Sequence, residues 1–283
     1  MLGYNRRMHT RVLTPAPPPD CTPTHAAVRV AAIGDLHLRD DAPVSLRWSL
    51  LAAREQADLL VIAGDITESG RVAEAEVAAR LLADLGMPVV AVLGNHDRRG
   101  LRRGAFRQAL TAAGIFLLDG DALELPTACG VRVGIAGTPG CGGGFWSDNH
   151  AAMPHGRAFK ALAVRARREC ARLDRALAAL EAPVRIAVTH FAPTPSTLGD
   201  EPAAKWWMLG NAELGRVIDT HAVDLVLHGH AHAGAPLGRT KGGVPVRNVA
   251  LPVNGGLVMV PILARPPVPA PVLVPEIVAG AVL

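Results

Sequence analysis

Three histidines alternate with other residues in a short stretch of the chain, at His228, His230 and His232. The apolar run 225–227 precedes them. Alternate side chains of a strand point to one face, so a strand that runs into a turn at Gly229 would aim the three rings into one space. Neutral imidazole is the commonest metal-binding side chain. A single histidine is more often a packed or surface residue, but this spacing favours a metal site.

Further carboxylate, amide and imidazole side chains follow four other apolar runs, at 28–33, 59–63, 89–93 and 184–189. In open α/β sheets, binding sites form at the carboxyl ends of the parallel strands, so the ends of separate strands meet there. The sequence therefore predicts one site assembled from the whole sheet. The residues at these expected strand ends are Asp35, His37, Asp65, Asn95, His96, Asp97 and His190.

This order of motifs resembles the calcineurin-like metallophosphoesterases, over roughly residues 28 to 262. The resemblance implies an α/β fold, a four-layer α/β/β/α sandwich with two mixed sheets, with metals at the strand ends along one edge. The alternation of strand and helix patterns independently indicates a parallel βαβαβ unit at the start of the domain. The expected helices cover residues 44–56, 72–85, 101–113 and 157–180, and the last expected strand covers 256–264.

The resemblance also implies two divalent metal ions that share the carboxylate of Asp65. The resemblance further implies that His96 does not bind metal but protonates the leaving oxygen, and that Asp97 holds the His96 ring in the right tautomer. His228 has no ligand position in the family pattern, so support of a ligand or packing is expected for it. Oxygen and nitrogen donors suit Mn²⁺, Fe or Zn²⁺. The implied ligands are Asp35, His37, Asp65 and His232 for one ion, and Asp65, Asn95, His190 and His230 for the other.

Two other interpretations of these residues are open to the sequence. Asp35, Asp65 and Asn95 each lie between an expected strand and an expected helix, where they would serve as helix N-caps. Caps leave the accompanying histidines unexplained. A non-catalytic scaffold on the same fold would have lost ligands, whereas every ligand position of the pattern is filled in this chain. The sequence therefore favours an enzyme.

Two such ions support hydrolysis of a phosphate ester by attack of a hydroxide that both ions share. Purple acid phosphatases use a tyrosinate ligand after the bridging aspartate, and the only tyrosine of this chain is Tyr4. Ser/Thr protein phosphatases carry Asp-Arg-Gly where this chain has Glu-Ser-Gly at 68–70. The Asp-Ile-Thr segment at 65–67 resembles a bacterial subgroup that contains phosphodiesterases. A small phosphodiester is therefore the expected substrate, with a phosphomonoester of a small metabolite as the alternative and a nuclease as a less favoured one.

Three segments are candidates for the substrate pocket. Arg98 follows His96 closely and could clamp a phosphate, although an exposed arginine is the simpler interpretation. Trp206 and Trp207 could stack on a base, and burial in the core is an equal alternative for them. The glycine-rich segment 140–146 is expected to be a mobile loop over the metals.

Length and composition set the frame of these predictions. The chain has 283 residues, which favours one large domain at 27–264 between a disordered lead-in at 1–26 and a Pro-rich tail at 265–283. The net charge of +4 is mild, so it suits a small anionic substrate and does not favour nucleic acid. Scattered cysteines and the lack of an export signal or membrane span predict a reduced cytoplasmic protein. The oligomeric state is left open.

Overall fold

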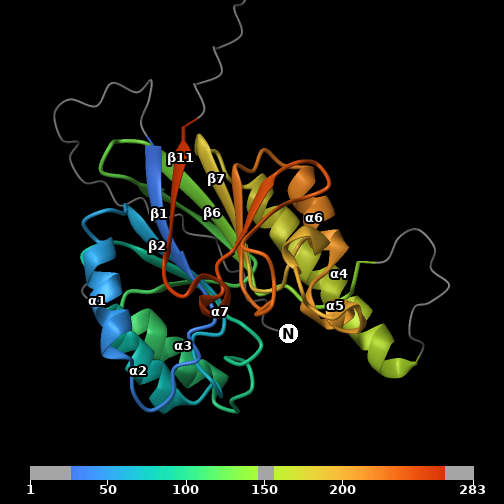
Figure 1. Ribbon diagram of the computed structural model, residues 1–283, viewed down its shortest axis with the longest axis horizontal. Helices are drawn as coiled ribbons and strands as arrows, with labels where there is room; N and C mark the ends of the chain where they lie inside the picture. Colours follow the sequence, from blue (N-terminus) through green and yellow to red (C-terminus); the bar gives the residue numbers. More distant parts are fainter. Residues whose placement is uncertain (1–26, 84, 146–155, 265–283) are drawn as a thin grey trace, which may run out of the picture.

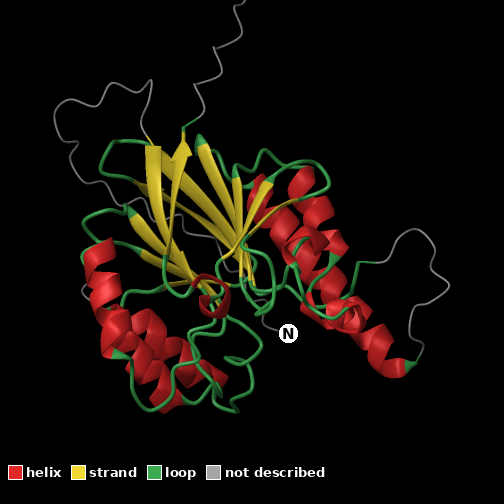
Figure 2. Cartoon of the chain, viewed as in Figure 1, coloured by secondary structure: helices red, strands yellow, loops and turns green. Residues whose placement is uncertain are grey.

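The computed structural model describes residues 27–83, 85–145 and 156–264 (Figure 1). The expected lead-in at 1–26 and the expected tail at 265–283 lie outside the described residues. Two mixed β-sheets stack face to face, and each carries helices on its outer side (Figure 2). The predicted α/β/β/α sandwich is therefore confirmed.

The first sheet has five strands in the order β11-β1-β2-β3-β4. The four strands β1 to β4 run parallel, and β11 pairs with β1 in the opposite direction. All residues of β2 are buried, as expected of a parallel strand covered on both faces. The strands are β1 (Ala27–Ile33), β2 (Leu59–Ala63), β3 (Val89–Val92), β4 (Phe116–Leu118) and β11 (Val258–Leu263).

The second sheet has six strands in the order β5-β6-β7-β8-β10-β9. Its four central strands, β6, β7, β8 and β10, run parallel to one another. The edge strands β5 and β9 are each antiparallel to their neighbour. The parallel directions of the two sheet centres bring their carboxyl ends to the same side of the molecule, near α7 in Figure 1. The strands are β5 (Asp121–Pro126), β6 (Arg132–Thr138), β7 (Val184–Thr189), β8 (Leu225–His228), β9 (Leu237–Arg239) and β10 (Pro245–Asn248).

Helices α1, α2 and α3 cover the first sheet, while α4 and α6 cover the second (Figure 1). The four expected helices are present, each with a C-terminal end one to three residues earlier than expected. Helix α6 was not expected from the sequence. The helices are α1 (Val44–Ala53), α2 (Val72–Leu82), α3 (Arg103–Ala112), α4 (Arg157–Ala178), α5 (Trp206–Leu209), α6 (Ala212–Asp219) and α7 (Leu251–Asn254), with short 3₁₀ turns at Pro195–Thr197 and Ala203–Lys205.

Three apolar clusters separate the four layers. One lies between the first sheet and its helices and includes Leu50 and Phe106. A second lies between the two sheets and includes Val61, Ile135 and Val188. The third joins the second sheet to α4 and α6. Because the middle cluster fixes one sheet on the other, it also fixes the distance between their strand ends.

No helix in the described part of the chain is long and apolar enough to cross a bilayer. Among the described residues, Cys129, Cys141 and Cys170 are free cysteines. The cytoplasmic location stays a prediction.

Leu50→Ala is expected to lower the free energy of unfolding by about 2–5 kcal/mol, because it leaves a cavity under α1. Leu50 is 0% exposed, whereas Leu101 is 100% exposed. The matched change Leu101→Ala should therefore alter stability by less than about 0.5 kcal/mol. Denaturant unfolding followed by circular dichroism measures both. Equal losses for the two variants would contradict the assignment of this core.

Candidate metal centre

The structure brings the predicted strand-end residues into one place. Asp65 follows β2 in the first sheet and His190 follows β7 in the second, yet Asp65 Oδ2 lies 3.3 Å from His190 Nε2. The carboxylate of Asp35, after β1, lies 2.9 Å from His232 Nε2, after β8. The helix N-cap interpretation is wrong for both aspartates, because α1 and α2 begin after Pro43 and Arg71.

Three overlapping groups of potential ligand atoms lie at the site, and Asp65 belongs to two of them; the group of His37, Asp65 and His96 joins the two that hold the predicted ligands. Within each group, the potential ligand atoms lie within 4.8 Å of one another. Asp65 Oδ2 is a member of the second group and lies 3.9 Å from His37 Nε2 of the first. Asn95 Oδ1 joins the second group at 2.9 Å from His190 Nε2. The first group is Asp35, His37 and His232, and the second is Asp65, His190 and His230.

The backbone at these positions is held in an uncommon conformation. Among the described residues, the non-glycine positions with positive φ are Asp35 (59°), His37 (47°), Asp65 (47°) and His230 (71°). All four belong to the predicted ligand set. Left-handed backbone at non-glycine residues costs free energy and persists where the surroundings enforce it, which is typical of functional sites.

Two glycines make room for the site carboxylates. A Cβ atom at Gly94 would overlap Asp65 Oδ1 and lie 2.6 Å from Asp65 Cγ. A Cβ atom at Gly229 would overlap Asp35 Oδ2. The sequence places glycine at both strand ends because the carboxylates occupy the space that any other side chain would need.

The charges of the site favour a bound cation. Burial disfavours a charge on His190, but the adjacent carboxylates of Asp65 and Asp35 outweigh it and raise the pKa of His190 to about 9. Burial also opposes ionisation of Asp65, and His190 more than offsets it, so the pKa of Asp65 is lowered. Without a metal, His190 therefore carries a proton that neutralises Asp65. A divalent ion would replace this proton, since ligating imidazole is neutral.

Other imidazoles of the site are suited to metal binding as neutral bases. Burial lowers the pKa of His230 to about 3. Both ring nitrogens of His37 are buried and form no hydrogen bond within the described part of the chain. Glu68 Oε2 lies 3.2 Å from His37 Nδ1, but not in hydrogen-bonding geometry. A buried polar atom without a partner is costly, and a metal ion at His37 Nε2 would remove this cost. The residues present therefore fit divalent cations.

Hydrogen bonds to backbone carbonyls orient the imidazoles of His190 and His230. His190 Nδ1 donates to the Ala63 carbonyl at 2.9 Å, so Nε2 faces Asp65 and Asn95. His230 Nε2 donates to the Met208 carbonyl at 3.1 Å, which leaves Nδ1 for the site. A carbonyl on the second nitrogen fixes the tautomer of a ligand histidine.

His96 is oriented by Glu68 and not by Asp97. Its Nδ1 donates to the Glu68 carbonyl at 2.7 Å, and its Nε2 points into the site, 4.0 Å from Asp65 Oδ2. Arg99 Nη2 lies 2.8 Å from the same Nε2. The expected role of Asp97 as the group that orients His96 is therefore wrong, because the chain turns so that a nearby carbonyl reaches the ring instead.

The carboxylate of Asp97 joins two ligand loops. Its Oδ1 accepts hydrogen bonds from the backbone N–H and the hydroxyl of Thr67, both at 2.8 Å. Its Oδ2 accepts from the N–H groups of Gly94, at 2.8 Å, and Ile66, at 3.2 Å. Burial and the charge of Asp65 raise the pKa of Asp97, while the four donors hold its ionised form. Asp97 thus fixes Asp65 relative to Asn95.

Glu68 is a residue of the site that the sequence did not reveal. Its carbonyl accepts from His96, and its carboxylate lies beside the His37 and His96 rings, at 3.2 Å and 3.5 Å from their Nδ1 atoms. Its position three residues after Asp65 is the only signal in the sequence. That signal was too weak to separate Glu68 from a solvated surface residue.

His228 does not reach the donor groups, so the expectation that three rings share one space is wrong for it. His228 is the last residue of β8 and is fully buried. Its Nε2 lies 2.8 Å from Thr197 Oγ1, and its Nδ1 donates to the Gly229 carbonyl. Burial lowers its pKa to about 4. Packing is therefore its role, while the turn that follows carries His230 and His232 to the site.

The glycine-rich segment 140–144 is mostly buried and is not a free loop over the metals. Gly143 N–H donates to the Trp207 carbonyl, and Gly144 N–H to the Gly210 carbonyl, both at 2.9 Å. These hydrogen bonds tie the segment to α5. Trp146 lies outside the described residues.

The two tryptophans of α5 are half-buried. Trp206 Nε1 donates to the Glu201 carbonyl at 2.9 Å, and the Trp206 ring meets Phe145 edge to face. Helix α5 reaches the centre through the Met208 carbonyl on His230. A base-stacking role for Trp206 and Trp207 stays a prediction.

Asp97→Asn is expected to lower the free energy of unfolding by about 1–3 kcal/mol, because an amide group would face backbone N–H donors that need acceptors. Asp41 is exposed, so Asp41→Asn is the matched control and should leave stability unchanged. Denaturant unfolding measures both variants. A stable Asp97→Asn protein would argue against the clamp between the two loops.

Gly94→Ala is expected to weaken Mn²⁺ binding by about 10–100-fold, because the added methyl group displaces the Asp65 carboxylate. Gly104, in α3, has open space around it, so Gly104→Ala should leave Mn²⁺ binding intact. Isothermal titration calorimetry on chelator-treated protein measures both affinities. Unchanged binding in Gly94→Ala would show that Asp65 is not part of the metal centre.

Comparison with known proteins finds one relative in sequence over part of the chain and solved structures that resemble it. A probable cyclic nucleotide phosphodiesterase of Synechococcus sp. is 35% identical over 79 residues, which is 24% of this chain and 31% of that protein. The match thus spans about a third of the length of this relative. One crystal structure covers 79% of this chain and 90% of its own, with a TM-score of 0.53 and 15% identity. The match to the crystal structure of TT1561 of Thermus thermophilus covers 83% of this chain and 99% of that one, with a TM-score of 0.48 and 15% identity.

The family assignment follows from a longer match. The family model described as calcineurin-like phosphoesterase matches residues 28–234, which include every strand end of the donor groups. Proteins of this family use divalent metals, and the carboxylates and imidazoles described above provide donors for them. The chain belongs to the calcineurin-like phosphoesterases.

Proposed function

We propose that this protein is a phosphodiesterase that acts on a small phosphorylated substrate with two divalent ions held on either side of Asp65. The observation that carries the proposal is the position of Asp65 Oδ2. It lies 3.3 Å from His190 Nε2 and 3.9 Å from His37 Nε2, so one carboxylate oxygen is near a histidine of each proposed ligand set. A shared carboxylate of this kind lets two cations lie close together without repelling each other fully.

The donor atoms indicate which metal ions the site would take and which residues would hold each ion. Mn²⁺, Fe or Zn²⁺ suits their oxygen and nitrogen atoms. When bound, such ions supply Lewis acidity toward the ester oxygens and lower the pKa of water at the site. The residues that would hold one ion are Asp35, His37, Asp65 and His232, and those that would hold the other are Asp65, Asn95, His190 and His230.

His96 supports the proton transfer that hydrolysis requires. Its ring is fixed by the Glu68 carbonyl on Nδ1, and its Nε2 faces the donor groups. For this role, Nε2 would have to release its contact with Arg99 Nη2, which donates to it at 2.8 Å, and take up the second ring proton, which would then pass to the leaving oxygen as the ester bond breaks. The backbone N–H of His96 donates to Asp65 Oδ1 at 2.8 Å, so the acid and the shared carboxylate hold a fixed relative position.

The preference for a diester rests on two supports. The relative from Synechococcus sp. bears the name of a probable cyclic nucleotide phosphodiesterase. The segment after the shared carboxylate, Ile66-Thr67, resembles the subgroup that contains phosphodiesterases.

With Mn²⁺ added, the protein is expected to hydrolyse bis(p-nitrophenyl) phosphate with a higher kcat/KM than p-nitrophenyl phosphate. Asp65→Asn should lower the rate at least about 100-fold, because it removes the shared charge between the donor groups. Asp121 is exposed at the start of β5, so Asp121→Asn is the matched control and should retain the rate. Release of p-nitrophenolate measures all three proteins.

Two outcomes would contradict the proposal. A higher kcat/KM for the monoester would make the protein a phosphomonoesterase. Fewer than one bound metal per chain after Mn²⁺ loading, measured by elemental analysis, would indicate a non-catalytic scaffold.

A further inference from the structure

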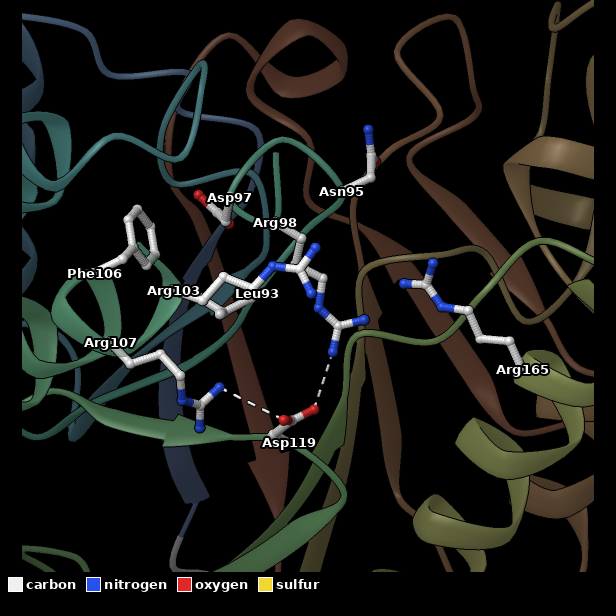
Figure 3. A pocket seen from close by; sticks show the side chains of 9 residues that line it. All are labelled: Leu93, Asn95, Asp97, Arg98, Arg103, Phe106, Arg107, Asp119 and Arg165. Atoms are coloured by element: carbon white, nitrogen blue, oxygen red, sulfur yellow. Dashed lines mark hydrogen bonds and ion pairs between the residues drawn. The ribbon is translucent and has the colours of Figure 1, made fainter. Parts of the chain in front are cut away.

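A cavity of about 550 Å³ lies beside the metal centre and has arginines on several sides (Figure 3). It opens next to Asn95, one of the proposed ligands. Figure 3 shows guanidinium groups that approach one space from the α3 side and from α4. We call this cavity the arginine pocket. The arginines that line it are Arg98, Arg103, Arg107 and Arg165, together with Leu93, Asn95, Asp97, Phe106 and Asp119.

The positive charge of the arginine pocket exceeds the negative charge available to it. Asp119 pairs with Arg98 at 3.1 Å and with Arg107 at 3.6 Å. It also pairs at 3.2 Å with Arg172, an arginine of α4 outside the lining. Three guanidinium groups thus share one carboxylate. The second acid of the lining, Asp97, already accepts hydrogen bonds from the ligand loops.

One further acid compensates only part of this charge. Glu169 Oε1 lies 3.7 Å from Arg98 Nη1 and 3.9 Å from Arg172 Nη1. Burial lowers the pKa of Arg98; the carboxylates of Glu169 and Asp119 oppose this shift, and the smaller effects of the Arg165 and Arg172 charges add to it. Like charges in a partly buried space repel one another unless an anion lies between them.

Two of the arginines have no structural role that explains their position. Arg98, Arg107 and Arg172 hold the turn at Asp119, which is a sufficient reason for their presence. Arg103 and Arg165 form no ion pair in the described part of the chain, although they line the same cavity from α3 and α4. Both side chains are exposed and are directed toward the cavity in Figure 3, so their guanidinium groups are available to a phosphate group there.

We propose that the arginine pocket binds a second phosphoryl group of the substrate, so that the protein prefers phosphodiesters that carry a further phosphate. This inference rests on the proposed function and narrows its substrate class. Guanidinium groups match phosphate oxygens in two-pronged hydrogen bonds, and several of them hold a dianion better than one. The volume of the cavity lies within the range of small-molecule sites.

The first test measures binding without catalysis. Inorganic pyrophosphate is titrated into chelator-treated protein by isothermal titration calorimetry. The double variant Arg103→Gln/Arg165→Gln should bind it at least about tenfold more weakly than the unaltered protein, since two charged hydrogen-bond donors are lost. The control Arg80→Gln/Arg168→Gln removes the same charge from exposed positions outside the pocket and should bind within about twofold. Equal affinities in both double variants would overturn the proposal.

The second test compares thymidine 3′-phosphate 5′-(p-nitrophenyl phosphate) with thymidine 5′-(p-nitrophenyl phosphate), with Mn²⁺ added. The ratio of their kcat/KM values should exceed about ten in the unaltered protein and in the control. It should fall toward one in Arg103→Gln/Arg165→Gln. The two esters differ only in the 3′-phosphate, so the ratio reports on that group alone.

The two tests separate the possible failures. Hydrolysis of both esters with a ratio near one, together with pyrophosphate binding, would mean that the pocket binds a free anion and would overturn its role in substrate choice. No hydrolysis of either ester would overturn the proposed function. Pyrophosphate binding that depends on Arg103 and Arg165 would in that case still support a phosphate site.

Discussion

The carboxylate of Asp65 has to lie within ion-pairing distance of imidazoles that other strand ends supply. His37 comes from the same sheet as Asp65, but His190 comes from the other sheet. The separation of 3.3 Å between Asp65 and His190 therefore depends on how the two sheets stack. The apolar cluster between the sheets sets this stacking, so the core positions the chemistry directly.

This arrangement concentrates unfavourable features in a small volume. Carboxylates are buried, four non-glycine residues of the described chain have left-handed backbone, and both ring nitrogens of His37 lack hydrogen bonds. The four donors on Asp97 and the open space at Gly94 keep the carboxylate of Asp65 in place. Such local costs are tolerated where the surrounding layers are well packed, and bound cations would offset them.

The loop after β3 shows how one short segment serves several purposes. Asn95 faces His190 in the second donor group, and His96 faces Asp65 from the other side. Asp97 turns inward to hold the loop after β2, while Arg98 turns toward Asp119 and the arginine pocket. Four consecutive residues thus connect the metal centre, the proton donor, the structural clamp and the proposed site for a second phosphate.

The sequence by itself determined the fold class and most of the converging residues, all of the predicted ligands among them, because strand ends and glycines leave a pattern that each segment carries alone. Tertiary structure decided the contacts between segments. Asp97 binds the loop after β2, and Glu68 rather than Asp97 meets His96. His228 turns to Thr197 and away from the donor groups. These outcomes depend on backbone directions at turns and on partners about thirty residues away, which no local pattern encodes.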